Sequence, residues 1–202
     1  MNIEEYFEDF MDELRSKAIS SGSSKEHVFI ESSLERVVDF GDLDNFDILY
    51  FEDEIEGAKP FHAFYFDEVF RQLTIAVSLY KEIEPQNLSN LTNTELSAPF
   101  KRATNFIKKA LEKKPDELAP KQSDLYTFII ELKNNWPQIK EVKFIFLTNK
   151  PLSKRYDQKE HGKIDKKNVS FGIWDLKRFF EVETSGTERE DIEIEFKDQP
   201  LS

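Results

Sequence analysis

Clustered carboxylates and one histidine are the side chains of this sequence best suited to chemistry. The acidic run 52–54 and the pair Asp67-Glu68 are expected at neighbouring strand ends, where clustered carboxylates can bind Mg²⁺ or Ca²⁺. No spacing resembles a calcium-binding loop, so a solvated acidic turn is the favoured interpretation. His62 could ligate a metal or act as a base. Since no aspartate or second histidine stands at a matching position, a hydrogen-bonded histidine in the core or at a strand end is favoured.

The segment 60–81 must position these groups, and it is predicted to be the centre of the fold. It contains two apolar strands, 61–66 and 73–79, joined by the polar turn 67–72. Both strands are rich in Phe, Ile, Val and Thr, which suit a pleated sheet. They are apolar at nearly every position, so we expect a hairpin that is buried on both faces at the centre of a sheet.

The composition is that of one globular domain. The chain has 202 residues, of which 39% are hydrophobic, with a formal net charge of −12 and no cysteine. The missing cysteine excludes disulfides, thiolate metal sites and cysteine nucleophiles. The acidic balance disfavours general adhesion to nucleic acid or to anionic membranes. No segment has the character of a signal peptide or a membrane span, so we expect a cytoplasmic protein without a membrane partner.

Periodicity and turn signals predict two helices, three strands, two helices, two strands, a helix and a final strand. Ser23 and Glu26 are expected to form the capping box of the second helix, Pro99 is expected in the first turn of the third helix, and Asp175 is expected to cap the last helix. We therefore predict a single α/β (α+β) domain over residues 1–202, with a mixed sheet flanked by helices on both sides. The predicted helices span residues 2–19, 24–39, 97–113, 123–135 and 175–180, and the predicted strands span residues 46–51, 61–66, 73–79, 142–148, 169–174 and 192–196.

Two basic segments oppose the acidic balance of the chain. The predicted helix 97–113 carries lysines on its exposed side, and residues 149–168 form a long basic loop in which Tyr156 could stack on a base. Charge balance on an acidic protein is the favoured explanation, but these segments are the best candidates for a nucleic-acid surface. The candidate contacts in the loop are Lys150, Lys154, Arg155, Lys159, Lys163, Lys166 and Lys167.

The predicted order of elements resembles the core of restriction-endonuclease-like nucleases, the PD-(D/E)xK class. In that class an aspartate opens the second strand, and an acid or glutamine, one spacer and a lysine lie in the third strand. The acidic groups hold Mg²⁺, and the lysine helps to organise the attacking water. The resemblance places the nuclease-like core at about residues 24–182.

Several segments resemble more closely the N-terminal domain of abortive-infection phage-resistance proteins. The likeness covers nearly the whole chain and is most distinctive in the last segment. It implies a bacterial phage-defence protein in which a larger domain follows, so we expect a truncated chain or a stand-alone relative. The segments that carry the likeness are FIESSLERVVDFG, FHAFYFDEVFRQLTIAVSLY, APFKRATNFIKKAL, VKFIFLTNKPLS and WDLKRFFEVETSGTEREDIEIEF.

The nuclease resemblance also implies where catalytic residues should stand. His62 takes the place of the second-strand aspartate, while Val77 and Leu79 take the places of the third-strand acid and lysine. A slip of two residues keeps the same strand face and would bring Lys81 to the lysine position, but it supplies no acid. Glu31 matches a helix glutamate often present in such nucleases, yet one carboxylate cannot hold a catalytic metal.

The sequence leaves three functions open and gives no oligomeric state. The first is a non-catalytic recognition domain, a pseudo-nuclease without a cofactor, whose partner is another protein, a downstream domain of the same polypeptide, or nucleic acid. The second is an active Mg²⁺-dependent nuclease in which relocated acids, Glu31, Glu52 or Asp67, act with Lys81. The third is a nucleic-acid-binding module that uses the basic loop. We favour the first, because the strand order is retained while the catalytic positions carry other side chains.

Overall fold

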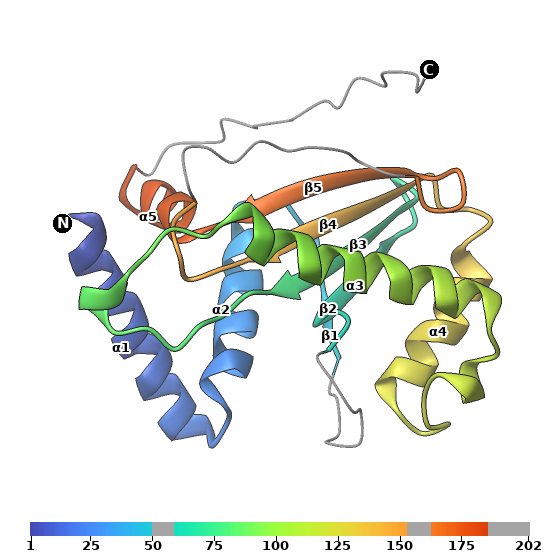
Figure 1. Ribbon diagram of the computed structural model, residues 1–202, viewed down its shortest axis with the longest axis horizontal. Coiled ribbons are helices and arrows are strands. Elements are labelled where there is room, and N and C mark those ends of the chain that lie inside the picture. Colours follow the sequence, from blue (N-terminus) through green and yellow to red (C-terminus); the bar gives the residue numbers. More distant parts are fainter. Residues whose placement is uncertain (50–58, 153–162, 186–202) are drawn as a thin grey trace.

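The computed structural model describes residues 1–49, 59–152 and 163–185 of the chain (Figure 1). Predictions that fall on residues 50–58, 153–162 and 186–202 lie outside the described residues, and the strand 192–196 is one of them. The helices are α1 (Ile3–Ser21), α2 (Lys25–Asp39), α3 (Asn93–Glu112), α4 (Asp124–Asn135) and α5 (Leu176–Ser185), with short 3-10 turns η1 (Pro85–Asn87) and η2 (Pro115–Glu117). The strands are β1 (Asp47–Ile48), β2 (Ala63–Asp67), β3 (Gln72–Ser78), β4 (Glu141–Leu147) and β5 (Asn168–Trp174).

The five strands form one mixed sheet in the order β1-β2-β3-β4-β5. The first three form an antiparallel meander, and β3, β4 and β5 run parallel to one another. Strand β3 is central and buried along nearly its whole length, as predicted. Strand β2 is half-buried from Tyr65 to Asp67, because only the short strand β1 lies beyond it, so the prediction that both strands of the hairpin are buried on both faces holds only for β3. Parallel strands need covering on both faces, and helices provide that cover here, so the predicted α/β class with a mixed, helix-flanked sheet is confirmed.

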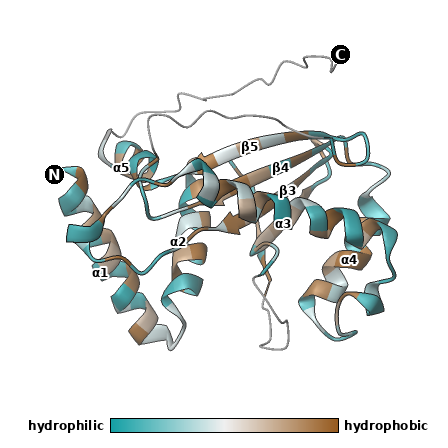
Figure 2. Cartoon of the chain, viewed as in Figure 1, coloured by the Kyte–Doolittle hydropathy of each residue, from teal (hydrophilic) through white to brown (hydrophobic). Residues whose placement is uncertain are grey.

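Two hydrophobic layers separate the sheet from its helices (Figures 1 and 2). On one face, Ile75 and Phe144 of the sheet pack with Phe128 of α4 and Ile107 of α3. On the other face, Ala76 and Ile145 pack with residues of α1, α2 and α5. Neighbours along β3 and β4 therefore alternate between the two cores, as strand geometry requires. Among the described residues, no helix combines the length and the apolar character that crossing a bilayer requires.

The helix starts differ from the predictions because local capping decides them. Helix α3 begins at Asn93, four residues earlier than predicted, since Thr92 and Glu95 form a capping box in front of it. Pro99 consequently lies inside α3 and not in its first turn. Helix α2 is capped by Ser24, whose hydroxyl accepts the backbone N–H of His27, so the capping box predicted from Ser23 is wrong.

The ends of two other elements also differ from the predictions. Of the strand predicted over residues 46–51, the sheet contains only Asp47 and Ile48 within the described part. Helix α5 continues beyond the predicted end at Phe180 to Ser185. Its extension matters for packing, because Glu183 of the added turn forms an ion pair with Arg36 of α2.

Candidate functional site

A β-bulge at the start of β2 sets the direction of His62. Ala63 is paired with Ala76 of β3, and the backbone N–H of His62 also donates to the Ala76 carbonyl, at 2.8 Å. Two consecutive residues thus oppose one, which is the arrangement of a bulge. As a consequence, Phe61 and Phe64 both pack in the core under α3 and α4 although they are three positions apart. His62 turns toward the opposite face, where its Nε2 lies 3.8 Å from a carboxylate oxygen of Glu26 on α2.

The His62 imidazole is buried and neutral. Its Nδ1 accepts the backbone N–H of Ser78 at 2.9 Å, so the ring proton resides on Nε2. Burial, with the positive charges of Lys59 and Arg102 as smaller causes, lowers the pKa of His62 to about 4. A neutral ring forms no ion pair with Glu26, and the contact between them is therefore weak. The predicted interpretation of His62 as a hydrogen-bonded histidine at a strand end agrees with this geometry.

The third-strand positions carry no group that could hold a metal or activate water. Val77 is buried in the core under α3 and α4, and Leu79 packs against the same core while its N–H donates to Leu147 at 2.8 Å. Lys81 follows β3 with an exposed side chain. It borders an open cavity of about 410 Å³ at this end of the sheet. Other charged residues that line the cavity are Glu82, Glu84, Glu95 and Lys150.

Most of the charged groups around that cavity are already bonded within the protein. Glu82 pairs with Lys25 at 2.7 Å and accepts the hydroxyl of Tyr80 at 2.8 Å. Lys150 pairs with Glu95 at 2.9 Å, and the Lys150 side chain is only 8% exposed. Burial opposes ionisation of Glu95, but hydrogen bonds from Lys150 and Thr92 outweigh it and lower the pKa of Glu95 to about 2. Lys150, which was predicted to contact a phosphate, therefore belongs to an ion pair within the protein.

The carboxylates proposed for an active nuclease do not converge in the part of the chain that the structure describes. Asp67 pairs with Gln72 at the turn of the hairpin, whereas Lys81 lies beyond the other end of β3, roughly 30 Å away for an extended strand. Glu31 is exposed on α2, and the carboxylate of that helix nearest to His62 is Glu26. Glu52 lies outside the described residues. Among the described residues, no group of three or more His, Asp and Glu is arranged to hold a metal ion.

Two polar residues in the segments that carry the resemblance to phage-resistance proteins, Asn149 and Asp175, have structural partners. Asn149 is fully buried, and its amide both accepts the N–H of Lys81, at 3.1 Å, and donates to the Lys81 carbonyl, at 2.7 Å. Asp175 caps α5 through the N–H of Arg178 at 3.0 Å, as predicted, and also accepts the N–H of Leu152 at 2.7 Å. These bonds fasten the chain segments that leave β3, β4 and β5 to one another.

The basic loop is described only in part. Lys154, Arg155 and Lys159 lie outside the described residues, while Lys163 and Lys166 are exposed. Lys167 is half-buried, and its ammonium lies 5.6 Å from the centre of the Trp136 ring, within the range of a cation–π contact.

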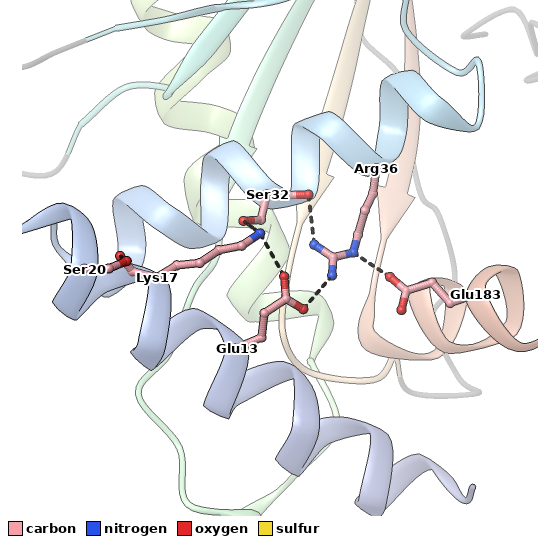
Figure 3. Close-up of polar contacts among 6 residues, drawn as sticks. All are labelled: Glu13, Lys17, Ser20, Ser32, Arg36 and Glu183. Atoms are coloured by element: carbon pink, nitrogen blue, oxygen red, sulfur yellow. Dashed lines mark hydrogen bonds and ion pairs between the residues drawn. The ribbon is translucent and has the colours of Figure 1, made fainter.

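Arg36 joins three helices on the other face of the sheet (Figure 3). Its guanidinium bonds to Glu13 of α1 at 3.0 Å, to Glu183 of α5 at 2.5 Å and to the Ser32 carbonyl of its own helix at 3.1 Å. Burial works against the charge of Glu13, but bonds from Lys17 and Arg36 hold the pKa of Glu13 below its usual value. No local sequence pattern indicates this network, because Glu13, Arg36 and Glu183 are far apart in the chain.

Comparison with known proteins identifies the family to which this arrangement belongs. The family described as "Abortive infection phage resistance protein N-terminal domain" matches residues 29–181, which extend from α2 to α5 and include the whole described sheet. No curated protein and no solved structure matches the chain significantly. The likeness predicted from the sequence segments is thereby confirmed, and the chain belongs to the family of abortive infection phage resistance protein N-terminal domains.

Proposed function

We propose that this domain recognises a partner and does not cut nucleic acid. It would be a bacterial, cytoplasmic pseudo-nuclease, with a restriction-endonuclease-like fold that has lost its catalytic groups and needs no cofactor. The order of elements supports the fold assignment. A helix, α2, precedes a three-stranded antiparallel meander, and a helical crossover then leads to β4, which lies parallel to β3.

One observation carries the proposal, and it is the hydrogen bond between His62 and Ser78. A metal-dependent nuclease needs negatively charged oxygens at the mouth of the hairpin. At that place a neutral imidazole accepts a backbone N–H, and Val77 belongs to the hydrophobic core. These groups close the end of the hairpin and offer no anionic ligand to Mg²⁺.

An active nuclease with relocated acids is the alternative. It requires carboxylates and a lysine within one coordination shell, together with Mg²⁺. The separation of Asp67 from Lys81 along the hairpin speaks against a shared site for this pair. The bonds of Lys150 to Glu95 and of Lys25 to Glu82 further reduce the free charges near Lys81.

The partner that we propose is another protein, a downstream segment of the same polypeptide, or nucleic acid. The description of the family as an N-terminal domain supports a downstream segment. Exposed lysines on α3 and in the turn 163–167 support nucleic acid.

A nuclease assay on the purified chain tests the proposal. Single-stranded and double-stranded DNA and RNA are incubated with Mg²⁺ or Mn²⁺, with EDTA in parallel. We expect no cleavage above that of buffer, because the hairpin supplies no acidic metal ligands.

Two variants separate true activity from a contaminating nuclease. EDTA-sensitive cleavage that is lost in Lys81→Ala or Glu26→Gln would contradict the proposal, since Lys81 follows Leu79 by two residues and Glu26 lies 3.8 Å from His62. If both variants cleave as the parent protein does, and the cleavage disappears after further purification, its source is a contaminating nuclease.

A further inference from the structure

The turn between β2 and β3 exposes two neighbouring apolar side chains. Val69 is 86% exposed and Phe70 is 72% exposed, and both lie at the opposite end of the hairpin from His62. Scattered exposed apolar residues are normal on a protein surface. An adjacent pair at the tip of the central hairpin is different, because it places an aromatic ring where it can contact another molecule.

Hydrogen bonds stabilise the backbone of the turn. A carboxylate oxygen of Asp67 accepts the N–H of Phe70 at 2.8 Å, and the carbonyl of Arg71 accepts the N–H of Lys140 at 2.8 Å. Arg71 has a φ of 56°, a left-handed conformation that is unfavourable for a non-glycine residue. Such conformations persist where the surroundings impose them, and they concentrate at functional sites. Phe70 is thus presented by a fixed support.

Cations from three strands meet beside Phe70. The register pairs Gln72 with Glu141 and Glu141 with Asn168, so the residues one position earlier, Arg71, Lys140 and Lys167, form a row. Adjacent strands lie about 4.8 Å apart, and the row is therefore about 10 Å long. Figure 1 shows the β2–β3 turn and the starts of β4 and β5 together at one end of the sheet. We call Phe70, Arg71, Lys140, Lys166 and Lys167 the basic edge.

Four acidic residues also lie at this end of the sheet, and three of them accept hydrogen bonds within the protein, which fix their positions but leave their charges in place. Asp67 holds the turn, Asp165 accepts the indole N–H of Trp136 at 2.9 Å, and Glu141 accepts the hydroxyl of Ser170. Glu68 is exposed.

Three of the four cations of the basic edge are available to a ligand, while Lys167 lies over the Trp136 ring. Arg71, Lys140 and Lys166 have exposed side chains and no ion-pair partner among the residues that the structure describes. Elsewhere in the fold cations such as Arg15 and Lys25 are paired with carboxylates. On a chain with a net charge of −12, unpaired cations grouped beside an exposed aromatic ring indicate an anionic ligand with flat apolar groups.

We propose that the basic edge binds single-stranded nucleic acid, with a base stacked on Phe70 and backbone phosphates bound by Arg71, Lys140 and Lys166. Aromatic stacking combined with cations along the backbone is the general mode of single-strand binding. A duplex keeps its base faces stacked and cannot use Phe70 in this way. Next to the turn, Gln72, Asn135 and Gln138 line a crevice of about 20 Å³ together with Asp67, Glu68 and Arg71, and such amides can hydrogen-bond to base edges. The inference rests on the proposed recognition role and names its partner.

Fluorescence anisotropy with a labelled oligothymidylate tests this assignment. The titration is carried out in EDTA at about 50 mM salt and repeated at higher salt. We expect saturable binding that weakens steeply with salt and exceeds the binding of a duplex of equal length. Phe70→Ala should weaken binding about 5- to 100-fold, as loss of one stacked base does. Arg71→Glu with Lys140→Glu should weaken it and reduce the salt dependence.

Matched variants separate stacking from general charge or misfolding. Phe70→Trp should retain binding and Phe70→Leu should lose it, because only the first keeps an aromatic face. Ile19→Ala and Lys121→Glu remove an exposed apolar residue and an exposed cation elsewhere, and they should bind as the parent protein does. Each variant is checked for folding by its thermal unfolding transition.

Three outcomes would overturn the inference. The first is that the folded protein shows no saturable binding of the oligothymidylate. The second is that Phe70→Leu binds it as tightly as the parent protein does. The third is that the protein binds polyglutamate as tightly as it binds the oligothymidylate, which would indicate an acidic protein as the partner. Since no metal is present, none of these results depends on whether the domain cleaves nucleic acid. Metal-dependent cleavage would contradict the proposed non-catalytic role and leave the binding result intact.

Discussion

His62 accepts the backbone N–H of Ser78 at 2.9 Å and thereby closes the open end of the β2–β3 hairpin. The bulge at His62 turns the ring out of the core under α3 and α4, and burial keeps the ring neutral. His62 lies where the nuclease resemblance implies a catalytic aspartate, and it has a structural role there. This role can be measured through the stability of the fold.

The first prediction concerns the pH dependence of unfolding. The folded pKa of His62 is about 4, below the ordinary value of 6.5, so the unfolded chain binds this proton more readily. The contribution of His62 to stability is complete above pH 6.5 and is lost progressively as the pH falls toward 4, by up to about 3 kcal/mol. Urea unfolding across this range should show the decline.

A non-titrating variant provides the control for His62. In His62→Asn the amide oxygen can occupy the place of Nδ1 and accept the Ser78 N–H, so this variant should lack the decline between pH 6.5 and 4. His62→Ala leaves the Ser78 N–H unsatisfied and should cost about 1–3 kcal/mol at neutral pH. An identical pH profile in His62→Asn and the parent would exclude His62 as the cause.

The second prediction concerns the ion pair between Lys150 and Glu95. Glu95→Gln preserves the capping oxygen of α3 but leaves the buried ammonium of Lys150 without its partner. We expect this variant to be less stable than Lys150→Met, which removes the buried charge. The double variant Glu95→Gln/Lys150→Met should have nearly the same free energy of unfolding as Lys150→Met. Urea unfolding of the parent, both single variants and the double variant measures these differences.

The same pair should also affect stability in acid. Since the pKa of Glu95 falls from 4.5 to about 2 on folding, its contribution is complete above pH 4.5 and is lost as the pH falls toward 2. This range lies below that of His62, so the two residues can be distinguished in one series. Glu95→Gln should remove only the decline in the lower range.

The regular elements of this fold could be predicted from sequence because their signals are local. The period of apolar residues located α2, α4 and β3, and Asp175 was predicted correctly as the cap of α5. The start of α3 was missed although its signal is also local. Thr92 and Glu95 have the spacing of a capping box, and they determine where α3 begins. The preference of Pro99 for the first turn of a helix is weaker than this capping interaction.

The polar contacts of the site could not be predicted, because their partners are distant in the chain. The partner of Asn149 is 68 residues away, and that of Arg36 on α5 is 147 residues away. The bulge at His62 depends in the same way on how β2 pairs with β3. Alternation along one strand contains no information about such a pairing, so the direction of His62 followed only from the structure.

The third prediction concerns Arg36 as the link among α1, α2 and α5. Arg36→Met removes bonds to Glu13, to Glu183 and to the Ser32 carbonyl, and we expect a loss of about 1–3 kcal/mol in the free energy of unfolding. The matched control is Lys177→Met, which breaks the exposed pair with Glu181 and should change stability by less than about 0.5 kcal/mol. Equal effects in urea unfolding would show that Arg36 is merely a surface cation.

The last prediction concerns the turn that contains Asp165 and Lys166, where one substitution should raise stability and weaken binding. Both residues have positive φ angles, of 45° and 67°, as a two-residue type I′ turn requires, and glycine is preferred at its second position. Lys166→Gly should therefore stabilise the fold by about 0.5–1 kcal/mol, which raises the Tm by roughly 1–4 °C in a chain of this size. Lys163→Gly is the matched control. It also removes an exposed lysine but lies outside the positive-φ positions, so it should not stabilise the protein.

If the basic edge binds single strands, Lys166→Gly should also bind oligothymidylate less tightly despite its higher Tm, because a lysine in this strained position then serves the ligand and not the fold.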